Sequence, residues 1–229
     1  MEYPHNRPYT ADDLVRIITL LRDPVNGCPW DKVQTHTSIR MNFLEEAYEA
    51  VDALDLDDPV LMCEELGDVL MQVAFHTCME QETGRFTWEQ VCDGVCQKLI
   101  ERHPNIFGTQ PGYEGITDWD ALKNKEKGRR TLADDLESVP RAMPALMRAA
   151  KLQKRAARHG AALQGADAAA LADAAENLQM AQPASAQAEQ AVGELLFAAA
   201  NLARQAGVDP EQALQKANEA FCTAAGPVV

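Results

Sequence analysis

The sequence predicts an all-α protein: a helical bundle followed by a second, smaller helical segment. Apolar residues recur three and four positions apart along nearly the whole chain, as on the buried face of an amphipathic helix. No segment sustains the alternation of apolar and polar residues that is typical of strands. With 229 residues, the chain can bury a core as one large domain or two small ones.

Turn and capping signals divide the first half of the chain into helices. Asp57, Asp58 and Pro59 mark a turn and a helix start. Thr87 can cap the following helix, and Pro104 ends it. We therefore expect helices near residues 11–22, 37–55, 60–82, 87–102 and 118–127, with a Pro- and Gly-rich surface loop over residues 103–117.

The composition changes beyond about residue 160, where alanine becomes abundant and Arg204 and Lys216 are the only bases. Gly67 and Gly193 each begin the same pattern of an acid, two apolar residues, a helix, a glycine and another helix, which indicates an internal repeat. Helices are expected near 141–158, 167–180, 186–206 and 210–223. We expect a first domain over 1–130, a connecting helix within 131–160, and a degenerate second repeat over 161–229.

Charge and composition argue against several classes of function. A net charge of -14 argues against a protein that grips a nucleic-acid backbone, because that task needs clustered Lys and Arg. No apolar run reaches the roughly 18 residues of a membrane span, and no signal peptide is visible, so we expect a cytoplasmic protein. Cys92 and Cys96 could form half of a zinc site, but no second Cys/His pair matches them.

Carboxylates gather in the segment FLEEAYEAVDALDLDDPVLMCEELGDVLMQVAFH, residues 43–76. At 100° per residue, Glu46 and Glu49 share one side of a helix with Glu45 beside them, and Glu65 and Asp68 repeat the spacing on the next helix. An antiparallel arrangement across the turn would bring the two acidic pairs together. The face of the first helix opposite its glutamates is expected to be buried, and it carries Phe43, Ala47, Tyr48, Val51 and Leu54. Most of the second helix is also expected to be buried.

An acidic helix face is usually solvated, but converging carboxylates on a buried helix need cations. Carboxylate oxygens without His or Cys suit Mg²⁺, with Mn²⁺ as a possible substitute, and Mg²⁺ commonly bridges to substrate phosphates. A di-iron bundle would need Glu-x-x-His on two helices, and the one match is Glu2 to His5 at a Pro-containing terminus. The pattern therefore favours a phosphate compound bound with its metal ion.

These residues resemble the MazG nucleoside triphosphate pyrophosphohydrolases. The signature E-E-x-x-E, spacer, E-x-x-D runs from Glu45 to Asp68, and GCPWDKVQTH (27–36), KLIERHPNIFG (98–108) and VPRAMPALMRAAKLQKRA (139–156) are also similar. The resemblance implies an all-α enzyme that converts nucleoside triphosphates, canonical or aberrant, to the monophosphate and pyrophosphate with Mg²⁺. Family members with two repeats form homodimers, so a homodimer is expected here.

By position, the resemblance makes Glu46, Glu49, Glu65 and Asp68 the metal ligands, and Glu45 could orient or deprotonate a water molecule. Lys98 and Arg102 are suited to phosphate oxygens, although a basic helix end can also complement the helix dipole. Trp30 and Trp119 could stack on a base or belong to the core. The residues expected to contact substrate are Trp30, Lys32, Asn42, Lys98, Arg102, Trp119 and Lys123.

The second repeat departs from the family pattern. Ala191 stands at the position of Glu65, Glu194 at that of Asp68, and Ala220 at that of Lys98. This half is therefore expected to serve dimerisation or scaffolding, with the chemistry in the first repeat. The alternative is a non-catalytic, regulatory helical protein that binds Mg²⁺ with a nucleotide.

Overall fold

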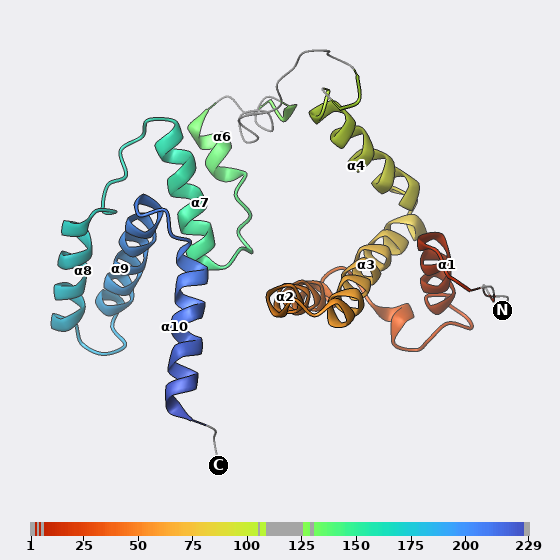
Figure 1. Cartoon of the computed structure of the whole chain (residues 1–229), viewed down its shortest axis with the longest axis horizontal. Helices are drawn as coiled ribbons and strands as arrows, with labels where there is room; N and C mark the ends of the chain where they lie inside the picture. Colours follow the sequence, from red (N-terminus) through yellow and green to blue (C-terminus); the bar gives the residue numbers. More distant parts are fainter. Residues whose placement is uncertain are drawn as a thin grey trace. The chain divides into compact units, whose positions relative to one another are not determined.

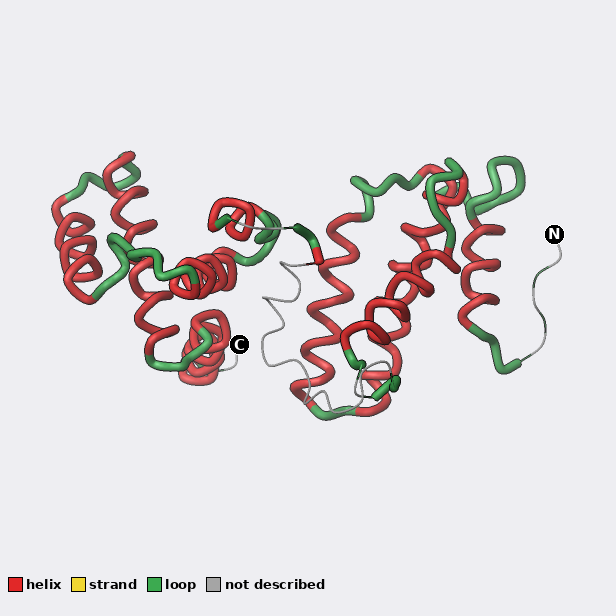
Figure 2. Tube along the Cα trace, turned by 90° about the horizontal axis from the view of Figure 1, so that it is seen from above, coloured by secondary structure: helices red, strands yellow, loops and turns green. Residues whose placement is uncertain are grey.

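The computed structural model of the chain describes residues 3, 5, 7–104, 106–108, 126–128 and 131–226. The chain divides into two compact units, Met1–Ile116 and Thr117–Val229. Across the described ranges the secondary structure consists of helices and loops, with no strand (Figure 2). The all-α prediction is confirmed. None of the described helices is both long and apolar enough to cross a membrane.

The first unit follows the predicted helix order. Its elements are α1 (Ala11–Leu21), η1 (Asp31–Val33), α2 (Arg40–Leu56), α3 (Pro59–Glu82) and α4 (Trp88–Arg102) (Figure 1). Asp58 caps α3 by accepting hydrogen bonds from the backbone N–H groups of Val60 and Leu61, and Pro59 is the first helical residue. Thr87 caps α4 in a reciprocal box with Gln90. The turn signals read from the sequence therefore act as expected, whereas the short η1 was not predicted.

The core of the first unit lies where α1 and the start of α4 meet the second half of α3. It contains Ile18, Ile39, Ala74, Phe75, Cys78, Met79 and Trp88. All buried residues of α3 come from Gln72 onward, whereas Leu66 and Leu70 are 50% and 41% exposed. The expectation that the helix of Asp68 is largely buried is therefore correct only for its second half. α2 is the main neighbour of α3, and the exposed Leu66 and Leu70 show that the first half of α3 is not enclosed within the described first unit.

The face of α2 opposite its glutamates is not packed inward as expected. Tyr48, Val51 and Leu54 are 49–53% exposed, and Phe43 and Ala47 are half-buried. The physical reason is that α3 is the main neighbour of α2, and α3 contacts only one side of it. The hydrophobic pattern therefore identified a face that needs a cover, but the described first unit does not supply that cover.

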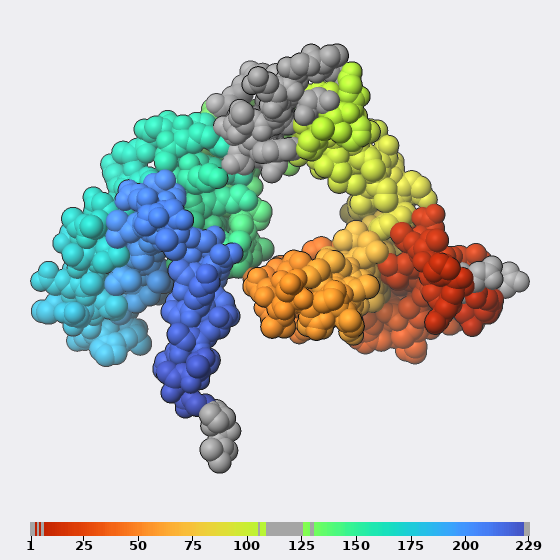
Figure 3. All heavy atoms as spheres, viewed as in Figure 1, coloured from red at the N-terminus to blue at the C-terminus, as the bar shows by residue number. Residues whose placement is uncertain are grey.

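The second unit contains α6 (Leu132–Glu137), α7 (Ala145–Arg158), α8 (Ala168–Met180), α9 (Ala186–Gln205) and α10 (Pro210–Ala225). The structure groups residues 131–160 with this unit, since α7 packs on α9 as well as on α6. α6 was not predicted, and the helix expected near 118–127 lies almost wholly outside the described residues. No residue of α10 is buried, and most of its length stands clear of α8 and α9 (Figure 3).

Both units contain the same helical hairpin, which supports the internal repeat. α2 packs on α3 in the first unit, and α8 packs on α9 in the second. Gly84 after α3 and Gly207 after α9 have φ angles of 70° and 71°, in the left-handed region that favours glycine. A capped helix follows each glycine, with Thr87 and Asp209 as the caps.

Candidate metal site

Glutamates from α2 and α3 converge on one point of the first unit. Glu46 and Glu49 of α2 and Glu65 of α3 each offer a carboxylate oxygen, and these atoms all lie within 4.8 Å of one another. It is the one such group of metal-ligating side chains among the described residues. The antiparallel turn at residues 57–58 thus brings together three of the four predicted ligands.

Asp68 lies outside that closest group but acts on it electrostatically. Burial raises the pKa of Glu46, and the charge of Asp68 raises it further, against a lowering by the hydrogen bond from Gln72. Burial also raises the pKa of Glu65, followed by the charges of Glu49 and Asp68. These carboxylates therefore repel one another at close range, which is the situation that a bound cation relieves. Glu45 is exposed beside the cluster.

A polar stripe continues from the cluster along α3, with a member at every fourth position: Asp68, Gln72, His76 and Glu80. Gln72 is 7% exposed, and its Nε2 donates to Oε1 of Glu46 at 3.4 Å. Its own Oε1 is buried and has no hydrogen-bond partner within the described part of the chain. The sequence placed Gln72 and His76 on this face but did not identify their partners.

His36 and His76 form a stacked pair at the far end of the stripe. Their Nδ1 atoms lie 2.7 Å apart, and the rings are nearly parallel at an interplanar angle of 5°. Nε2 of His36 contacts Oε1 of Glu80 at 2.5 Å, and Arg85 pairs with the same carboxylate. The pair lines an open groove of about 520 Å³ with Phe43 and Phe86 as aromatic walls.

Arg22 holds the loop that carries Trp30 and Lys32. Its guanidinium makes two hydrogen bonds to Glu82, and Nη1 also donates to the carbonyl oxygens of Asp31 and Gln34. Arg22 is 8% exposed, so this network fixes the loop against the end of α3. Trp30 is 57% exposed, which excludes the core role left open for it. Sequence analysis did not identify Arg22.

The other predicted substrate contacts are spread over α2, α4 and the chain after it. Lys98 is exposed and Arg102 half-buried near the end of α4, and Asn42 is half-buried in the first turn of α2. Trp119 and Lys123 lie outside the described residues. Substrate contact by these residues stays a prediction.

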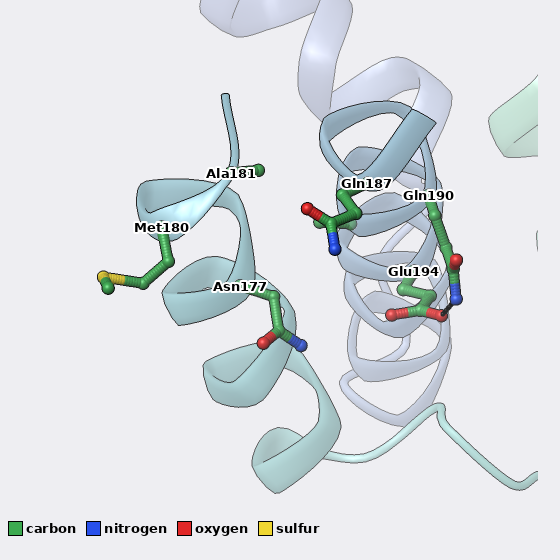
Figure 4. Close-up of a pocket in the computed structure, with 7 residues that line it drawn as sticks. Asn177, Met180, Ala181, Gln187, Gln190 and Glu194 are labelled. Carbon is green, nitrogen blue, oxygen red and sulfur yellow. Dashed lines mark hydrogen bonds between the residues drawn. The ribbon is translucent and has the colours of Figure 1, made fainter. Parts of the chain in front are cut away.

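In the corresponding hairpin of the second unit, amides surround the carboxylate of Glu194. Asn177 of α8 and Gln187, Gln190 and Glu194 of α9 line a pocket of about 240 Å³ (Figure 4). Gln190 Nε2 donates to Glu194 Oε1 at 2.8 Å, so the one carboxylate there already has a partner. Ala191, at the position of Glu65, is 2% exposed and packs between the helices.

Comparison with known proteins places these observations in a family. Residues 34–107 match the MazG nucleotide pyrophosphohydrolase domain. This segment contains the turn after η1 and the helices α2, α3 and α4. It therefore includes the acidic cluster, Gln72, His76 and Lys98.

The similarity to relatives extends over most of the chain. The nucleoside triphosphate pyrophosphohydrolase of Escherichia coli (strain K12) is 41% identical over 92% of this chain and 83% of its own length. The nucleoside triphosphate pyrophosphohydrolase/pyrophosphatase MazG of Thermotoga maritima is 39% identical over 92% of this chain and 82% of its own length. Such coverage includes both the acidic hairpin and the second unit.

Proposed function

Because the chain belongs to the MazG nucleotide pyrophosphohydrolase family, we propose that its first unit hydrolyses nucleoside triphosphates, canonical or aberrant, to the monophosphate and pyrophosphate. The observation that carries this proposal is the convergence of Glu46, Glu49 and Glu65 within 4.8 Å, with the charge of Asp68 acting on two of them. The cytoplasm, where these substrates are made and used, is the compartment in which we expect it to act.

The donor set fits a hard divalent cation, Mg²⁺ with Mn²⁺ as a substitute. All four candidate ligands, Glu46, Glu49, Glu65 and Asp68, offer carboxylate oxygens, and like-charge repulsion is one cause of the raised pKa values of Glu46 and Glu65. Such an ion, when bound, neutralises charge on phosphoryl oxygens and acidifies a bound water molecule. In this proposal Glu45, exposed next to Glu46, orients or deprotonates the attacking water.

Basic and aromatic side chains would hold the rest of the substrate. Lys98 and Arg102 are four apart on one face of α4, as expected for two contacts along a triphosphate. The exposed Trp30 offers a stacking surface, and the Arg22 network keeps it in place. Lys32, Asn42, Trp119 and Lys123 complete the proposed substrate contacts.

We also propose that the protein is a homodimer. Tyr48, Val51 and Leu54 on the face of α2 opposite its glutamates, and Leu66 and Leu70 of α3, are large apolar side chains that lie exposed in the described first unit. A second copy would cover them, and the second unit would add scaffolding. Light scattering after size-exclusion chromatography should give twice the 25.1 kDa chain mass, and Val51→Glu should shift the species toward monomer. A monomer for the native chain at micromolar concentration would contradict this proposal.

The product assay tests the proposed reaction. Purified protein is incubated with Mg²⁺ and a panel of ribo- and deoxyribonucleoside triphosphates, and the products are separated. Nucleoside monophosphate and pyrophosphate in equal amounts are expected. Nucleoside diphosphate with phosphate would contradict the proposal. Binding of the Mg²⁺-nucleotide in calorimetry without any turnover would instead support the regulatory, non-catalytic alternative.

A further inference from the structure

Gln72 is a buried amide whose hydrogen bonding is only half complete. It is 7% exposed on α3, one turn after Asp68, and its Nε2 donates to Oε1 of Glu46 at 3.4 Å. The amide oxygen, Oε1, is buried without a donor among the described residues. Buried polar atoms nearly always have partners, so an orphaned acceptor beside a ligand cluster needs an explanation.

The direction of the amide is fixed by chemistry. The ionised carboxylate of Glu46 can only accept, so the Gln72 nitrogen is the atom that faces Glu46, and this contact leaves the amide oxygen unsatisfied. The contact to Glu46 is long for a hydrogen bond, so it contributes little to folding. An apolar side chain at this position would avoid the orphaned oxygen altogether. The amide is therefore better explained by the cluster than by the core.

A hydrated cation bound at the cluster would supply a partner for this oxygen. Mg²⁺ usually keeps several water molecules when it binds to protein carboxylates, and each of these waters is a hydrogen-bond donor. Outer groups that hold metal ligands in place and accept from bound water commonly change metal affinity by 10- to 100-fold when they are removed.

We propose that Gln72 is a positioning residue of the metal site, holding the carboxylate of Glu46 through Nε2 and accepting a hydrogen bond from a metal-bound water through Oε1. The inference rests on the proposed function in taking the cluster of Glu46, Glu49 and Glu65 as a metal site. It requires no assumption about which nucleotide is hydrolysed.

The test is a titration of the whole chain with Mn²⁺ alone, followed by electron paramagnetic resonance of the free ion. Gln72→Met keeps the side-chain length and removes both polar atoms. Its Mn²⁺ dissociation constant should rise about 10- to 100-fold. Its thermal midpoint should be unchanged or higher, because a buried unpartnered oxygen is lost. A merely structural amide would show the reverse, a lower midpoint with unchanged affinity.

Gln153 of the second unit provides a matched control. It is 1% exposed on α7, its Nε2 donates to the carbonyl oxygen of Phe197 at 2.7 Å, and its Oε1 also lacks a partner among the residues that the structure describes. Because its one hydrogen bond satisfies a backbone group, Gln153→Met should lower the thermal midpoint and leave Mn²⁺ affinity unchanged. A similar loss of affinity in both variants would overturn the inference.

Kinetics at varied free Mg²⁺ give a second readout. Gln72→Met should need 10- to 100-fold more Mg²⁺ for half-maximal turnover and approach the native rate at saturation. Native Mn²⁺ affinity in Gln72→Met overturns this inference and leaves the proposed function standing. Failure of the native chain to bind Mn²⁺ overturns both.

Discussion

His36 and His76 share a hydrogen bond between their Nδ1 atoms, which lie 2.7 Å apart in nearly parallel rings. Only one of the two nitrogens can carry the hydrogen, so one imidazole donates and the other accepts. Burial lowers the pKa of His76 below its ordinary value of 6.5, and the neighbouring His36 lowers it further. The folded protein thus favours a neutral His76, although Glu80 and Arg85 face the other side of the pair.

The first prediction is that this pair makes the protein less stable in mild acid. Below about pH 6.5 the unfolded chain binds a proton at His76 that the folded chain binds only at lower pH, so the free energy of unfolding falls as pH decreases. His76→Phe removes this contribution. Urea denaturation from pH 5 to 8 should show a shallower loss for the variant below pH 6.5 and parallel curves above about pH 7.5. Equal slopes below pH 6.5 would contradict the prediction.

The second prediction compares the two hairpins. Glu49→Gln removes one charged carboxylate, a proposed metal ligand, from the acidic cluster, whereas Glu194→Gln makes the same change at an exposed carboxylate of α9. Glu49→Gln should lower nucleotide turnover by more than about 100-fold, since losing a ligand exceeds the effect of losing an outer partner. Glu194→Gln should retain native turnover. Equal losses in steady-state assays would contradict this prediction, and a larger loss for Glu194→Gln would locate the chemistry in the second unit.

The third prediction concerns Gly27, which precedes the Trp30 loop. A Cβ atom there would lie 2.4 Å from the carbonyl oxygens of Leu21 and Asp23, and backbone atoms cannot rotate away. Gly27→Ala should therefore destabilise the protein by about 1–3 kcal/mol in chemical denaturation. Gly94→Ala, in open space within α4, should stabilise it by about 0.5–1 kcal/mol through helix propensity. The free energy of unfolding should therefore fall in Gly27→Ala and rise in Gly94→Ala, and a change of the same sign in both variants would contradict the prediction.

The fourth prediction concerns Asp135, which is 1% exposed in α6 of the second unit. Its carboxylate pairs with Arg155 at 3.0 Å and Arg158 at 2.7 Å, and His159 lies 3.2 Å away. Asp135→Ala leaves buried Arg155 without its counter-ion and should cost about 3–5 kcal/mol of unfolding free energy.

The control for this change is Asp173→Ala on the exposed face of α8, which should stay within about 0.5 kcal/mol of the native value. Urea denaturation with a far-ultraviolet circular dichroism signal measures both. A loss below about 1 kcal/mol for Asp135→Ala would mean that Arg155 finds another partner or water once the carboxylate is gone.

Periodicity and capping chemistry predicted most of the fold because they act locally. The start of α3 follows from Asp58 and Pro59, and the start of α4 from Thr87. α6 was missed because it has six residues, too few for a helical period to be visible, and its stability comes from tertiary pairing of Asp135.

The candidate site was predictable to the extent that helical spacing controls it. The spacing of Glu46, Glu49 and Glu65 brought the three together as expected. The pairing of His36 with His76 joins residues 40 positions apart, and no local pattern encodes it. The exposed Leu54 could not be predicted either, because an apolar stripe in the sequence does not specify which surface will cover it.

The glycine turns after α3 and α9 support the prediction that one helical hairpin was duplicated. In the proposed division, the copy with Glu65 retains repelling acids that chemistry needs, and the copy with Ala191 exchanges them for close helix contact. Mutations in the second hairpin are then selected for folding alone, whereas those in the first are selected for folding and turnover together. Natural variation should therefore accumulate faster in α8 and α9 than in α2 and α3.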